Sequence, residues 1–181
     1  MDFPILSSII FLPLLGSIFI FLSKSQDNNQ SAIYVSLFTS IANFIIALFL
    51  WYSFDNNYIG FQFLEEKKWI SGFIKFKLGI DGISILFIVL TTFIIPLCII
   101  SCVNSVKERV KEFLIAILIL ETFMIGVFCS LDLVIFYLFF EAGLIPMFLI
   151  IGVWGGPKKV YAAFKFFLYT LLGSVFMLVA I

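Results

Sequence analysis

Six runs of about 20 apolar residues dominate the sequence, and each is long enough to cross the hydrocarbon core of a bilayer as a helix. Polar segments separate them, such as S-K-S-Q-D-N-N-Q-S before the second run and G-G-P-K-K before the sixth. Backbone groups inside the hydrocarbon must be bonded within their own segment, so each run is expected to be helical. We therefore predict an all-α, polytopic transmembrane bundle with spans at residues 3–22, 32–54, 82–103, 113–129, 133–153 and 161–181.

Composition excludes several classes of protein. Hydrophobic residues make up 63% of the chain and charged residues 12%, which excludes a water-soluble fold. The net charge is zero, so nucleic-acid binding has no support. Histidine is absent and the three cysteines (Cys98, Cys102 and Cys129) form no C-x-x-C pair. We therefore expect no metal or cofactor site in this chain, and we interpret the cysteines as apolar packing residues.

The loops between the spans differ in charge. Loops one, three and five carry Lys24, Lys107, Arg109, Lys111, Lys158 and Lys159, whereas the short fourth loop carries no lysine or arginine. The positive-inside rule then places the odd loops in the cytoplasm or matrix and the N-terminus outside. The long second loop, residues 55–81, holds four lysines together with Glu65 and Glu66. Its alternating segment F-I-K-F-K-L, residues 73–78, predicts a strand or small hairpin at the outer surface.

Glu141 lies near the middle of the fifth span, with Pro146 five residues further on. An ionisable side chain at this depth costs about 2.5 kcal/mol or more and usually marks an ion or proton pathway. The proline removes a backbone donor and tends to kink the helix. We interpret Glu141 as the main candidate for proton transfer. The alternative is a structural acid that is hydrogen-bonded to neighbouring helices.

Glu121 is the second buried acid, in the fourth span. Counted from Asp132 in the turn, Glu121 and Glu141 lie at depths of about 16 and 14 Å, given a rise of 1.5 Å per residue. Two nearby carboxyls in a low dielectric do not both stay ionised, so one is expected to hold a proton near neutral pH. The alternative for Glu121 is a structural role towards a helix outside this chain.

Three further polar residues accompany these acids. Lys165 lies early in the sixth span, where it either reaches back to the interface or acts as a cation coupled to Glu141. Asp132 is expected to cap the fifth helix and Asp81 the third. The candidate site residues are therefore Glu141, Glu121 and, with weaker support, Lys165.

Several strings in the sequence resemble one family of membrane proteins. They are L-G-I-D-G-I-S (78–84), E-T-F-M-I-G-V-F (121–128), F-E-A-G-L-I-P-M (140–147), G-V-W-G-G (152–156) and A-A-F-K-F-F-L-Y-T (162–170). Together they resemble the antiporter-like subunits of respiratory complex I, in particular subunit 4, called subunit M in bacteria. The resemblance runs from about the second loop to the end of the chain.

The resemblance implies a fold with inverted five-helix repeats that begin at the fourth span. Residues 1–111 would then hold spans one to three with the outer loop 55–81, and residues 112–181 the incomplete start of the antiporter-like repeat. Glu141 matches the family's fifth-span glutamate, which pairs with a lysine on a seventh span, and Glu121 matches its fourth-span acid. Lys165 matches a lysine early in the sixth span. Because the chain stops at Ile181 without a polar tail, we expect it to be the N-terminal part of a longer subunit.

The resemblance also implies a function, namely proton translocation in a membrane subunit of NADH:quinone oxidoreductase. Partner subunits would bind NADH, FMN, iron–sulfur clusters and quinone, and the other membrane subunits of complex I and membrane lipid would surround the chain. The expected location is a mitochondrial inner or bacterial plasma membrane. One alternative is a subunit of a cation/proton antiporter or membrane-bound hydrogenase. A second is a non-transporting structural or assembly protein.

The charge pattern of the loops gives a test of orientation. We predict that Lys158→Cys, on a background without the native cysteines, reacts with an impermeant thiol reagent from the cytoplasmic or matrix side. Asp132→Cys should react from the opposite side, because one span separates the two positions. Labelling of Lys158→Cys solely from the outside would overturn this orientation.

Overall fold

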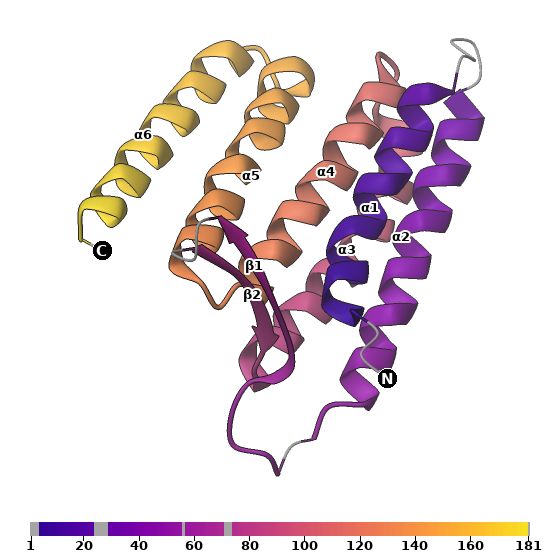
Figure 1. Ribbon diagram of the computed structural model, residues 1–181. Helices are drawn as coiled ribbons and strands as arrows, with labels where there is room; N and C mark the ends of the chain where they lie inside the picture. The colour runs from indigo at the N-terminus through magenta and orange to yellow at the C-terminus, as the bar shows by residue number, and fades with distance from the viewer. Residues whose placement is uncertain (1–3, 24–28, 56, 71–73, 181) are drawn as a thin grey trace.

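Six long helices lie side by side in the computed structural model, which describes residues 4–23, 29–55, 57–70 and 74–180 (Figure 1). Each helix is long and apolar enough to cross a membrane, which confirms the predicted transmembrane bundle. The helices are α1 (Ile5–Leu22), α2 (Asn29–Tyr52), α3 (Gly82–Ser105), α4 (Val110–Cys129), α5 (Leu133–Trp154) and α6 (Lys159–Ala180).

The observed helices follow the predicted spans closely. Helices α2, α4 and α6 begin two or three residues before the apolar runs, because helical hydrogen bonding continues into the polar segments at the membrane surface. Lys24 lies outside the described residues.

Helices α1 to α4 form a four-helix group, α5 packs on α4, and α6 packs mainly on α5 at the edge of the molecule (Figure 1). The first turns of α2, α4 and α6 lie at one end of the bundle. The start of α1, the α4–α5 turn, the β-hairpin and the end of α6 lie towards the other end. This alternation agrees with the predicted segregation of odd and even loops.

The second loop forms the predicted hairpin. Strand β1 (Gln62–Ile70) pairs antiparallel with β2 (Ile74–Ile80), with Glu66 opposite Lys77. The hairpin is fastened to the α4–α5 turn, where the backbone N–H of Leu131 donates to the carbonyl of Lys77 at 3.0 Å and Leu78 forms a bridge with Ser130. The β-hairpin thus lies against the turn that joins α4 and α5, the two helices that carry Glu121 and Glu141.

The hairpin also caps α1. Pro4, at the N-cap position, gives no side-chain hydrogen bond, so the first amides of α1 need acceptors from elsewhere. Glu65 of β1 supplies them: its Oε1 accepts from the N–H of Leu6 at 2.8 Å, and its Oε2 accepts from the N–H of Ser7 at 3.2 Å and from the Ser7 hydroxyl. A carboxylate here also complements the positive end of the helix dipole.

Both predicted aspartate caps are confirmed. Asp81 accepts from the N–H of Ser84 at 2.7 Å, and this backbone hydrogen bond holds the pKa of Asp81 below its usual value. Asp132 accepts from the N–H of Val134 at 2.9 Å at the start of α5. The two caps fix where α3 and α5 begin, one beside the hairpin and one in the α4–α5 turn.

Two hydrophobic clusters hold α1 to α4 together, one towards each end of the bundle. The hairpin cluster comprises Leu6, Ile9, Ile10, Ala47, Leu50, Leu78, Ile80, Ile85, Ile88, Ile125, Cys129, Ile135 and Phe139. The far cluster comprises Ile20, Ala32, Ile95, Ile99, Cys102, Val110, Leu114, Ile117 and Leu118. Each of the four helices contributes to both clusters, so the middle of the bundle lies between them.

The Glu65 cap predicts a measurable loss of stability. Glu65→Ala removes the carboxylate that accepts from the amides of Leu6 and Ser7 and should destabilise the protein by about 0.5–2 kcal/mol. Glu65→Gln keeps one acceptor oxygen without the charge and should lose less. Thermal unfolding of the purified protein in detergent measures both changes, and equal stability of Glu65→Ala and wild type would contradict the cap.

Candidate functional site

A layer of buried polar side chains lies between the two hydrophobic clusters. On each of α1 to α4 its members fall between the residues that belong to one cluster and those that belong to the other. A polar layer at mid-depth is unusual in a transmembrane bundle, where buried polar groups need partners within the protein. The polar layer consists of Ser17, Ser36, Thr39, Ser40, Asn43, Thr91, Thr92, Glu121 and Thr122.

Most of this layer satisfies itself locally. Each serine and threonine hydroxyl donates to a backbone carbonyl three or four residues earlier on its own helix. Asn43 and Glu121 differ, because they bond to each other across α2 and α4. Asn43 Nδ2 donates to Glu121 Oε1 at 2.8 Å, and both side chains are 0% exposed. Among the described residues, no other side chain–side chain hydrogen bond joins two of the transmembrane helices.

This pair leaves two buried oxygens without a protein partner, Asn43 Oδ1 and Glu121 Oε2. Buried polar atoms are nearly always hydrogen-bonded, so such exceptions usually have a chemical reason. No ion pair reaches Glu121 from any described residue. The predicted burial of Glu121 is therefore confirmed, and its partner is the amide of Asn43.

The α4–α5 hairpin sets the depth of the second acid. Gly126 of α4 lies against the ring of Phe139 of α5, and Gly143 of α5 lies against Phe123 of α4. This register places Glu141 opposite the turn that follows Glu121, about one helical turn or 5 Å nearer to Asp132. The two acids are therefore at similar depth, as predicted.

Glu141 is the one charged residue of α5. Its side chain is half-buried, and its Oε2 is buried without a hydrogen-bond partner. No hydrogen bond joins the carboxyls of Glu141 and Glu121. Pro146, inside the same helix, has no N–H, so the usual helical donor to the carbonyl of Ala142, the residue after Glu141, is missing.

Lys165 lies exposed on α6. Its Nζ is 5.9 Å from the ring centroid of Tyr161 and 5.8 Å from that of Tyr169, one turn before and after it. The structure shows no ion pair between Lys165 and Glu141. Both roles proposed for Lys165, a side chain that reaches the membrane interface and a cation coupled to Glu141, stay predictions.

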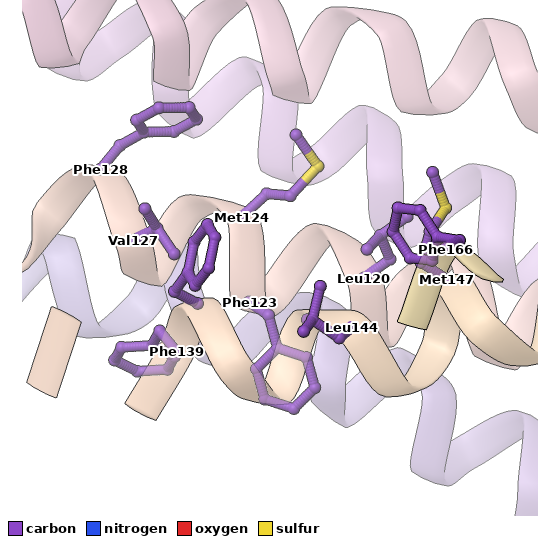
Figure 2. A pocket seen from close by; sticks show the side chains of 11 residues that line it. Leu120, Phe123, Met124, Val127, Phe128, Phe139, Leu144, Met147 and Phe166 are labelled. Carbon is purple, nitrogen blue, oxygen red and sulfur yellow. The ribbon is translucent and has the colours of Figure 1, made fainter. Parts of the chain in front are cut away.

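A pocket of about 340 Å³ lies between α4 and α5, with Phe166 of α6 at its border (Figure 2). Figure 2 shows apolar side chains around it, among them Phe123, Met124, Phe139 and Leu144. Neither acid lines this pocket. Its apolar lining suits acyl chains or apolar side chains.

Within the described part of the chain, no group of three His, Cys, Asp or Glu side chains could hold a metal ion. The cysteines are free thiols: Cys102 and Cys129 are buried in the two clusters, whereas Cys98 is exposed on α3.

Three contributions to the site escaped the sequence analysis. Asn43 lies in a polar stripe at helical spacing with Ser36, Thr39 and Ser40, and this stripe was the available signal for a buried face of α2. The close contact at Gly126 and the capping role of Glu65 depend on residues distant in the sequence. Neither has a local signal.

Two family models match the chain. One is described as "NADH-ubiquinone oxidoreductase chain 4, amino terminus" and matches residues 6–127. The other is described as "NADH:quinone oxidoreductase/Mrp antiporter, TM" and matches residues 130–181. The first model covers more than half of the chain.

Curated relatives and a solved structure agree with these models. NADH-quinone oxidoreductase subunit M of Rhodobacter capsulatus is 55% identical over 97% of this chain and 35% of its own length. NADH-ubiquinone oxidoreductase chain 4 of Marchantia polymorpha is 51% identical over 97% of this chain and 36% of its own length. A chain in the structure of respiratory complex I from Thermus thermophilus with bound NADH superimposes with a TM-score of 0.80 at 27% identity, over 97% of this chain and 34% of that chain. The chain thus spans about a third of the length of the relatives that it matches.

The register of α4 and α5 predicts a contrast between two glycines. A Cβ at Gly126 would lie 2.5 Å from a ring carbon of the buried Phe139, so Gly126→Ala should destabilise the protein by about 1–3 kcal/mol through overpacking. A Cβ at Gly143 would meet Phe123 at 3.6 Å, an ordinary contact. Gly143→Ala should therefore be neutral or slightly stabilising, since alanine favours helix. Thermal unfolding in detergent compares the two, and equal effects would contradict the register.

Proposed function

Because this chain belongs to the NADH-ubiquinone oxidoreductase chain 4 family, whose bacterial members are named NADH-quinone oxidoreductase subunit M, we propose that it serves in proton translocation by respiratory complex I. It is a multi-pass membrane protein with the antiporter-like fold. In the proposed function it forms part of a membrane subunit that moves protons while partner subunits oxidise NADH and reduce quinone.

The observation that carries this proposal is Glu141. It is the one charged residue of α5, and its half-buried carboxyl has an oxygen without a hydrogen-bond partner. A carboxyl that is not tied to a neighbour can take up a proton and release it with little reorganisation of the protein. The carbonyl of Ala142 beside it lacks its usual helical donor because of Pro146, and we propose that it accepts from water or from a protonated carboxyl. Both features suit a transfer site better than a structural anchor.

The energy for translocation must come from outside this chain. Moving one proton against 100 mV requires about 2.3 kcal/mol. We propose that NADH, FMN, iron–sulfur clusters and quinone are bound by partner subunits, and that redox-driven changes there reach Glu141. The family resemblance implies a relay lysine on a seventh span, which would lie in the part of the subunit that this chain does not include. The proposed location is an energy-transducing inner membrane.

A second candidate function is a subunit of a cation/proton antiporter, supported by the "Mrp antiporter" in the description of the model that matches residues 130–181. Membrane-bound hydrogenases are a related candidate. A purely structural role is a third, against which Glu141 argues, because its carboxyl at mid-depth has no partner that it would hold in place. The proteins that copurify with this chain distinguish these candidates.

The proposed function predicts the effect of removing one titratable group. In the assembled complex, Glu141→Gln should preserve folding, since size and hydrogen bonding are largely kept. It should lower proton uptake and coupled NADH oxidation by roughly tenfold or more, because an amide neither takes up nor releases a proton at these pH values. NADH:quinone activity and proton uptake, measured in membranes with normal content of the complex, test this.

Two variants serve as controls. Glu141→Asp keeps the titratable group on a shorter arm and should retain part of the activity. Lys165→Ala changes an exposed side chain and should do less harm than Glu141→Gln. Wild-type proton uptake by Glu141→Gln would reduce Glu141 to a structural residue and remove the main support for the proposal.

A further inference from the structure

The Asn43–Glu121 pair brings an amide and a carboxyl group together in the polar layer. Each group has one atom in the hydrogen bond between them, Asn43 Nδ2 and Glu121 Oε1, at 2.8 Å. Each also has one oxygen that is buried and unpartnered, Asn43 Oδ1 and Glu121 Oε2. We propose that Glu121 is a resident protonated acid, kept neutral by its complete burial, and that its proton satisfies the two remaining oxygens of the Asn43–Glu121 pair.

The hydrogen-bond inventory supports the protonated form. An ionised carboxylate is solely an acceptor, so Glu121 Oε2 and Asn43 Oδ1 would be two acceptors without a donor. A proton on Oε2 turns that oxygen into a donor, and the amide oxygen of Asn43 is the unpartnered acceptor of the same pair. One proton thereby completes both groups. The carboxylic acid then accepts from the amide N–H of Asn43 through Oε1 and has an O–H donor on Oε2 for the amide oxygen.

The surrounding charge supports it as well. Helices α1, α2 and α3 contain no aspartate, glutamate, lysine, arginine or histidine within their described bounds. The charged residues of α4 apart from Glu121 are Lys111 and Glu112, in its first turns. A carboxylate with 0% exposure and no cation nearby is strongly disfavoured relative to its neutral form.

Other titratable groups reach α4 from the elements packed against it. On α2, Tyr34 and Tyr52 are largely exposed, and on α3 Cys98 is exposed and Cys102 lies in the far cluster. Lys77 of strand β2 lies at the hairpin end of the bundle. The acid of α5 is Glu141, which has no hydrogen bond to Glu121. The remaining groups are Tyr137 on α5 and Cys129 at the end of α4.

This inference assigns different roles to the two buried acids. Glu121 keeps its proton because its complete burial disfavours the charged form, whereas the partly exposed, unpartnered carboxyl of Glu141 is the group that exchanges. The assignment of proton exchange to Glu141 rests on the proposed function. The protonation of Glu121 itself does not, since it depends on α2 and α4 alone.

Glutamine is the closest neutral mimic of a protonated glutamate. In Glu121→Gln the new amide can donate to Asn43 Oδ1 and accept from Asn43 Nδ2, so the paired arrangement is retained. Glu121→Gln should therefore assemble to the wild-type level. Glu121→Ala leaves Asn43 without a partner and should reduce the amount of assembled protein several-fold.

Infrared spectroscopy of the resting protein, in the complex that it forms in its own membrane, tests the protonation directly. Wild type should show a C=O stretching band of a protonated carboxylic acid at neutral pH that is absent from Glu121→Gln. The band should shift in ²H₂O. Asn43→Leu should keep this band but move it to higher frequency, because the carbonyl loses its donor. Glu141→Gln provides a background without the other acid, and Thr122→Val, the neighbouring buried hydroxyl, should leave the band unchanged.

Each outcome decides the question. Identical spectra of wild type and Glu121→Gln in this region would mean an ionised carboxylate, with water as the donor to both oxygens, and would overturn the inference. Failure of Glu121→Gln to assemble would also overturn it, because the mimic of the neutral acid would then not substitute for it. Neither measurement uses NADH turnover, so a failure of the proposed function leaves both results interpretable.

Discussion

The burial of two acids in helices almost free of other charge is the constraint on which the rest of this structure depends. Glu121 is completely buried, and its carboxyl meets the amide of Asn43 at 2.8 Å. That contact forms only when α2 is rotated so that Asn43 faces α4 and when Asn43 and Glu121 lie at the same depth. The two hydrophobic clusters supply this, because every helix from α1 to α4 contributes to both of them. The packing of these apolar clusters thereby holds Asn43 and Glu121 in hydrogen-bonding position.

The β-hairpin connects the helices at one end of the bundle. Glu65 on β1 holds the first amides of α1, and the backbone of β2 is bonded to the α4–α5 turn. Helices that start and end far apart in the sequence are thus tied together at the surface. The same turn, capped by Asp132, sets the depth of Glu121 on one helix and of Glu141 on the next. Loop and transmembrane core therefore act together to position the acids.

Hydropathy and charge were enough to predict the six helices, the hairpin, both aspartate caps and the depth of Glu121 and Glu141. These features depend on local pattern or on distance along a helix, which the sequence contains. Asn43 was missed because an amide in an apolar run has no charge to mark it, and its pairing depends on how α2 is rotated towards α4. Glu65 was seen as a loop acid. Its capping role depends on contacts with residues 58 and 59 positions away.

The central claim is that Glu141 exchanges its proton during turnover while Glu121 retains its own. Reaction-induced infrared difference spectra, recorded on the complex as NADH reduces quinone, measure this most directly. We expect a protonated-carboxyl band that rises or falls with turnover and is lost in Glu141→Gln, with no turnover-dependent signal that is lost in Glu121→Gln. A turnover signal that persists in Glu141→Gln and disappears in Glu121→Gln would contradict the claim and make the α4 acid the exchanging group.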